Sequence, residues 1–87
     1  MKLVTSSRFE RSLRQFLRKH PDLKKELAGK LELLRRDPAN PSLRLHALSG
    51  KLRGCFAFAV SYEYRIVVEL KGSEVHLLAV GTHDEAY

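Results

Sequence analysis

The stretch HALSGKLRGCFAFAVSYEYRIVVELKGSEVHLLAVGTHDEAY, residues 46–87, decides the fold of this chain. Apolar residues alternate with other residues along 55–61, 64–70 and 74–80, a pattern typical of strands that turn one face toward a core. A tight connection follows the first of these segments, and a Lys-Gly-Ser turn at residues 71–73 follows the second. The stretch therefore predicts three successive strands.

Upstream of these strands, apolar residues recur at helical spacing in two segments, residues 8–19 and 21–36. The apolar face of the first segment is Phe9, Leu13, Phe16 and Leu17, and that of the second is Leu23, Leu27, Leu31 and Leu34. Ser7, followed three residues later by Glu10, forms a capping box that predicts the start of the first helix. His20-Pro21 ends that helix, because the residue before a proline is pushed out of the α region. We therefore expect a helical hairpin with a short turn.

A short edge strand at residues 2–4 precedes the helices, and residues 37–42, with two prolines and an asparagine, indicate a loop. The element order is then β-α-α-β-β-β. Helices that share an apolar face must cover one side of a sheet. We predict an α+β fold in which a two-helix hairpin packs on one face of a small antiparallel sheet, and residues 1–87 form one domain.

The opposite face of the sheet is expected to be shallow and basic. Cys55, Ala57 and Ala59 alternate onto it, and Arg53 and Arg65 lie on or near it. Small side chains beside cations make a surface suited to binding another molecule.

The composition favours a polyanionic partner without requiring one. The chain has 16 lysine and arginine residues against 10 aspartate and glutamate residues, a net charge of +6. Nucleic acid or an acidic protein segment would suit that excess, and an ordinary basic protein is an equally good interpretation. Cys55 is the single cysteine, so there is no disulfide framework, and the scattered histidines do not have the spacing of zinc ligands. We expect no metal or cofactor, and no membrane span, since no apolar run approaches about 20 residues; the cytoplasm is the expected location.

Two motifs carry a resemblance to a known family. The first is a histidine followed by L-x-G-x-x-x-G, and the second is a terminal G-T-H with an aromatic residue four positions after the histidine. Their residues are His46, Leu48, Gly50 and Gly54, and Gly81, Thr82, His83 and Tyr87. With the β-α-α-β-β-β order and the segment YEYRIVVEL, the whole chain resembles the RelE/ParE superfamily of toxins from bacterial type II toxin–antitoxin systems, closest to its YafQ-like branch.

The resemblance implies an mRNA endonuclease that acts in the ribosomal A site and is neutralised by a cognate antitoxin. It also implies functional positions at His46, Glu63, His83 and Tyr87. The chain departs from the YafQ-like pattern at Ala59, where that branch has another histidine. One member of the acid–base set is therefore missing.

Metal-free RNA cleavage uses the substrate 2′-hydroxyl as nucleophile, which makes the reaction specific to RNA. It needs a base, an acid for the leaving oxygen and cations for the phosphorane charge. His83 is the candidate acid, and either His46 or Glu63 is the candidate base. The candidate RNA-binding residues are Lys51, Arg53 and Arg65 for phosphate and Tyr64, like Tyr87, for stacking on a base. His20 and His76 receive no function.

Two other functions remain open. A ParE-like toxin of the same fold would bind DNA gyrase and cleave nothing, and the missing imidazole at Ala59 gives this alternative weight. A passive basic RNA-binding module is the third. For a toxin, we expect an antitoxin whose acidic or amphipathic segment covers the basic groove in a hetero-oligomer.

Overall fold

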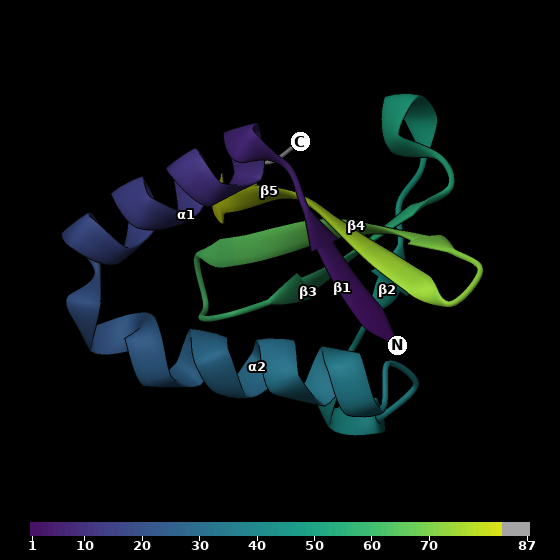
Figure 1. Cartoon of the computed structure of the whole chain (residues 1–87), viewed down its shortest axis with the longest axis horizontal. Coiled ribbons are helices and arrows are strands. Elements are labelled where there is room, and N and C mark those ends of the chain that lie inside the picture. Colours follow the sequence, from purple (N-terminus) through teal and green to yellow (C-terminus); the bar gives the residue numbers. More distant parts are fainter. Residues whose placement is uncertain (83–87) are drawn as a thin grey trace.

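A five-stranded sheet organises the computed structural model, which describes residues 1–82 (Figure 1). The strand order across the sheet is β1-β5-β4-β3-β2. The strands are β1 (Lys2–Thr5), β2 (His46–Ala47), β3 (Cys55–Ala59), β4 (Tyr64–Lys71) and β5 (Glu74–Thr82). The helices are α1 (Ser7–Lys19) and α2 (Lys24–Arg36), joined by the 3₁₀ turn Pro21–Leu23. The predicted α+β fold with a helical hairpin is confirmed, and two of the predicted site residues, His83 and Tyr87, lie outside the described residues.

The sheet is mixed, and not antiparallel throughout as predicted. β2, β3, β4 and β5 pair antiparallel in sequence order, whereas β1 pairs with β5 in parallel. Parallel neighbours need a long crossover, which the helical hairpin and the strands that follow it supply. Periodicity cannot reveal this direction, because it reports which face a residue is on and not how a strand runs relative to its neighbour. The short strand β2 is an additional element that the predicted order β-α-α-β-β-β does not contain.

Both helices pack on the same face of the sheet. Phe9 and Phe16 of α1 and Leu34 of α2 are buried against Phe58 and Ile66 of the central strands. Fully burying a side chain of this size contributes about 1.5–3 kcal/mol. The predicted apolar faces are therefore the ones that build the core, and they fix α1 across the sheet.

The first helix begins one residue earlier than the capping box predicted. Ser6 is the N-cap, and its Oγ accepts a hydrogen bond from the Phe9 backbone N–H at 3.0 Å. The Glu10 carboxylate accepts from the Thr5 hydroxyl at 2.8 Å instead of reaching a cap N–H. The Ser7 capping box is therefore wrong. Ser6 and Ser7 are adjacent, so either could cap the helix from the sequence alone. The burial of Phe9 favours a helix that begins after Ser6.

The face of the sheet away from the helices is partly apolar, which differs from the shallow basic surface predicted for it. Cys55, Ala57 and Val67 are buried there under Leu48 and Leu52, which come from the connection between β2 and β3. A bulge at Leu78, the extra residue between the pairs Val67–Ala79 and Val68–Leu77, brings Ala79 onto this face. We call this surface the open face. Only its far part, around Ala59 and Arg65, keeps small side chains beside a cation.

No helix in the described part of the chain is long and apolar enough to cross a membrane.

Candidate functional site

His46 and Arg65 share the open face, and strand pairing places them. His46 of β2 lies opposite Ala57 of β3, and Arg65 of β4 lies opposite Ala59 of the same strand. Directly opposed residues of an antiparallel pair point to the same side, and so do residues two apart along a strand. The Cα atoms of His46 and Arg65 are therefore roughly 12 Å apart, two strand spacings across and two residues along. Because Ala57 and Ala59 lie between them, both long side chains can reach a phosphate bound there.

Arg65 is flanked by small residues, and no carboxylate among residues 1–82 pairs with it. It lies between Ala59 of β3 and Gly81 of β5 in the sheet register, and its side chain is half-buried. Within residues 1–82, no ion pair involves Arg65, and Glu69 instead pairs with Lys71 at 3.3 Å. A guanidinium on a rigid strand with no internal anion is well suited to an external phosphate.

Glu63 belongs to the exposed turn that joins β3 to β4. It precedes Tyr64 and follows Tyr62, whose side chain is 97% exposed. The turn lies at the same end of the sheet as Ala59 and Arg65 (Figure 1). Glu63 is therefore near the polar part of the open face but is held only by a turn, whereas His46 is held by a strand.

Lys51 and Arg53 lie at the other end of β3. Both are exposed, in and just after the 3₁₀ turn Gly50–Leu52 that leads into that strand (Figure 1). The turn ends at Gly54 with φ +96°, a conformation that favours glycine. The length of β3, about 15 Å for its residues, separates this turn from Ala59. Lys51 and Arg53 therefore do not lie next to Arg65, and the three predicted phosphate-binding residues do not form one basic patch.

Tyr64 points to the helix side of the sheet, away from Arg65, because successive strand residues alternate between faces. Its ring lies 4.5 Å from that of His20 and 5.0 Å from that of Phe16, measured between centroids. The Phe16 and His20 rings are 5.3 Å apart. Three aromatic rings from α1, its C-cap and β4 therefore form one cluster.

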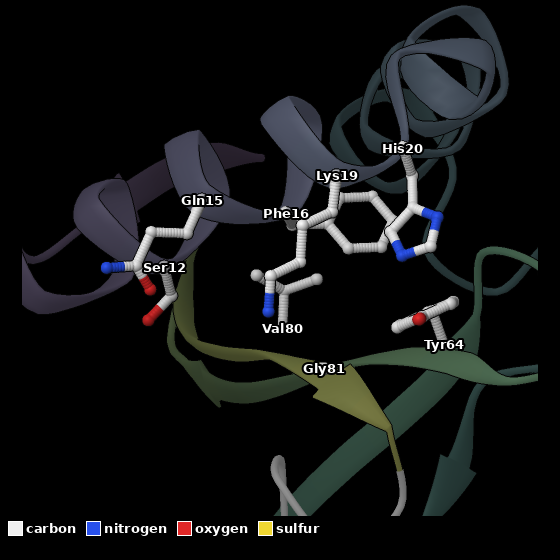
Figure 2. A pocket seen from close by; sticks show the side chains of 8 residues that line it. All are labelled: Ser12, Gln15, Phe16, Lys19, His20, Tyr64, Val80 and Gly81. Atoms are coloured by element: carbon white, nitrogen blue, oxygen red, sulfur yellow. The ribbon is translucent and has the colours of Figure 1, made fainter.

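A pocket of about 180 Å³ opens beside this cluster, between α1 and the ends of β4 and β5 (Figure 2). Its polar and aromatic lining is Ser12, Gln15, Phe16, Lys19, His20 and Tyr64. Gly81 of β5 also lines it, so the pocket lies on the helix side of the strand pair that carries Arg65. His20 was not predicted to be functional, although its position four residues after Phe16 places it on the apolar face of the first helix.

Cys55 is a buried free thiol. Burial, and secondarily the charge of Glu69, raises the pKa of this thiol above its ordinary value. Less of it is thiolate at neutral pH, so it is poorly suited to nucleophilic or metal chemistry. Among residues 1–82, no group of three or more histidine, cysteine, aspartate or glutamate side chains is placed to hold a metal ion.

No protein-family model and no curated protein matches the sequence. Solved structures do. A copper-bound mutant toxin from Helicobacter pylori is 26% identical, with a TM-score of 0.85 over 100% of this chain and 99% of its own. A YoeB/ParE toxin from Agrobacterium tumefaciens is 18% identical, with a TM-score of 0.80 over 95% of this chain and 99% of its own. The E. coli DinJ–YafQ toxin–antitoxin complex matches at 19% identity, with a TM-score of 0.78 over 95% of this chain and 92% of the matched chain.

These structures span nearly the whole length of the chain, helices and sheet together. They include YafQ, the protein whose branch the two sequence motifs resemble. Residues 1–82 thus build the fold of the RelE/ParE-like toxins, in its YafQ-like form.

Proposed function

We propose that this protein is the toxin of a type II toxin–antitoxin pair and that it inhibits translation as a metal-independent, ribosome-dependent mRNA endonuclease. One observation carries the proposal. A chain with the fold of these toxins has a strand-borne histidine and an arginine that makes no ion pair within residues 1–82 on the same face of its sheet, with small side chains between them. Fold alone does not decide function, so the argument rests on this pair.

In the proposed reaction, the 2′-oxygen of the RNA forms a bond to the adjacent phosphorus, and the bond from phosphorus to the 5′-oxygen breaks. The products are a 2′,3′-cyclic phosphate and a 5′-hydroxyl. His46 accepts the proton of the 2′-hydroxyl, and His83 donates a proton to the 5′-oxygen. Arg65 stabilises the additional negative charge of the phosphorane.

His46 is assigned as the base in preference to Glu63 because a strand holds a side chain in a more defined position than an exposed turn. Glu63 is then assigned to orient the substrate from the turn between β3 and β4. Tyr87 is assigned to substrate contact. Lys51 and Arg53, at the far end of β3, contact RNA away from the cleaved bond and add affinity without reading its sequence.

The proposed partner is an antitoxin, by analogy with the complex of YafQ and DinJ. The net charge of +6 favours an acidic segment of that partner. The proposed location is the cytoplasm, where mRNA and ribosomes are available.

A reconstituted translation extract with mapping of new 5′ ends tests the activity. We expect codon-phased cleavage by the wild type, and a loss of at least about tenfold in His46→Ala and in His83→Ala, because each removes a proton-transfer group. His76→Ala is the matched control. It removes a histidine on β5 that contacts Glu74 at 3.0 Å, outside the proposed site, and should cleave like the wild type.

Glu63→Gln distinguishes the two candidate bases. It should lower the cleavage activity less than His46→Ala does. The reverse order would mean that Glu63, and not His46, is the base. Intact mRNA together with stalled DNA gyrase would contradict the nuclease proposal and favour a ParE-like activity. Intact mRNA with active gyrase would leave a passive RNA-binding module.

A further inference from the structure

The pocket between α1 and the ends of β4 and β5 is separate from the proposed catalytic face, yet one residue touches both. Gly81 lines the pocket and is also the register partner of Arg65. Since glycine has no side chain, only the backbone of β5 lies between the pocket and the surface beside Arg65. A strand of RNA whose phosphate is at Arg65 can thus pass the strand ends and place a neighbouring nucleotide at the pocket.

We propose that this pocket binds one nucleobase of the RNA, next to the cleaved phosphate, and so sets which codons are cut. The inference rests on the proposed nuclease function and adds the ligand class of a second subsite. The volume supports a single ring system. About 180 Å³ is below the roughly 300–1,000 Å³ of pockets that hold drug-sized ligands.

The aromatic cluster provides the stacking surface. The rings of His20 and Tyr64 are 4.5 Å apart, and Phe16 lies behind both. His20 and Tyr64 are partly exposed, whereas Phe16 is buried. Bases that are splayed out of a single strand stack on exposed rings of this kind, and this recognition is common in RNA-binding proteins.

The remaining lining is polar and is available to a ligand. Figure 2 shows Lys19 extending from α1 into the space above β5, with Gln15 and Ser12 farther along the same helix. In the part of the chain that the structure describes, the side chains of these three residues make no hydrogen bond or ion pair. An amide and a hydroxyl suit the edge of a base, and an ammonium suits a phosphate.

These groups favour a base over an apolar side chain of the antitoxin as the occupant. An apolar anchor would make no use of the Gln15 amide and the Lys19 ammonium, whereas a nucleotide can accept hydrogen bonds from both. A base satisfies both the rings and the polar groups.

Nuclear magnetic resonance titration of the full chain tests this subsite without requiring cleavage. The probe is a trinucleotide with 2′-O-methyl groups, which cannot supply the nucleophile. We expect shifts of the amide signals of Gln15, Lys19, His20 and Gly81. An otherwise identical abasic trinucleotide should shift them much less.

Variants separate base contact from charge. His20→Ala and Gln15→Ala should each weaken trinucleotide binding about fivefold or more. Gln15 is exposed, so Gln15→Ala keeps the test valid if the loss of His20 disturbs the fold. Lys19→Ala is compared with Arg18→Ala, which removes the same charge from the adjacent exposed position outside the pocket. Only the former should weaken binding beyond the general effect of charge.

Equal binding of the abasic probe, or shifts confined to the open face, would overturn the subsite. In the translation extract, Gln15→Ala should redistribute cleavage among codons, because it removes a group that contacts the edge of the bound base. An unchanged codon distribution would also count against it. If the wild type cuts no mRNA, the proposed function fails, and the titration still decides whether the pocket takes a base.

Discussion

Ala59 occupies the position on the open face where a third catalytic side chain would be expected. It lies opposite Arg65, and two residues along β3 from Ala57, which is opposite His46. A side chain at position 59 would therefore point into the space between the proposed base and the proposed phosphate ligand. The methyl group there leaves that space open, and the proposed proton transfers depend on fewer groups than in the YafQ-like pattern.

Ala59→His should increase mRNA cleavage about tenfold, because an imidazole beside Arg65 can take part in proton transfer. The position is only partly buried, so the larger side chain can extend over the open face without entering the core. The measurement is the initial rate of appearance of mapped 5′ ends in the translation extract.

Ala59→Asn is the control for this substitution, since it adds a polar side chain that does not titrate near neutral pH. It should leave the rate near that of the wild type or lower it. An increase of equal size in both variants would mean that added bulk, and not proton transfer, produces the effect.

Other residues show how far the site could be predicted. The alternation that put Ile66 and Val68 in the core also puts Tyr64 on the helix side, so its separation from Arg65 could be deduced from parity along β4. Tyr64 was instead predicted to stack on a base, as one of the RNA-binding residues together with Arg65. His20 could be placed on the helix face from its spacing to Phe16, but its contact with Tyr64 required the packing of α1 on the sheet.

At the scale of elements, the start of α1 is set by a single side chain. The Ser6 hydroxyl accepts from the Phe9 N–H, so Ser6→Ala should lower the free energy of unfolding by about 1 kcal/mol, within a typical range of about 0.5–2 kcal/mol. Ser7, now the first residue of the helix, makes no such bond in the described structure. Ser7→Ala should change stability little, since alanine is a good helix former. Urea denaturation followed by circular dichroism compares the two variants. A larger loss of unfolding free energy in Ser7→Ala would mean that Ser7 is the N-cap, as the capping box predicted.

The elements themselves were largely predictable, because helical spacing and strand alternation report directly on burial. The parallel pairing of β1 with β5 and the bulge at Leu78 were not. Both depend on which strands become neighbours, and the local sequence does not contain that information. The bulge matters for the site, because it puts Val80 in the core and Gly81 beside Arg65.

At the scale of the whole molecule, the sheet separates two apolar clusters of unequal size. The larger lies under the helices and includes Phe9, Leu34 and Phe58, while the smaller on the open face has Cys55 and Ala57 at its centre. The site lies at the ends of the strands that both clusters share. Its geometry therefore depends on the helices through the larger cluster, although neither helix contributes to the open face.

Leu34→Ala tests this dependence. Leu34 is fully buried between α2 and the sheet, and removing its branched end leaves a cavity that typically costs about 2–5 kcal/mol. An 87-residue chain at about 0.05–0.15 kcal/mol per residue has a free energy of unfolding of only about 4–13 kcal/mol, so this variant should lose a large share of its stability. Leu33→Ala removes the same atoms from the preceding, partly buried position and should cost clearly less. Urea midpoints from circular dichroism give both values. Equal losses would mean that Leu34 contributes no more to the core than Leu33, and would contradict the packing of α2 through Leu34.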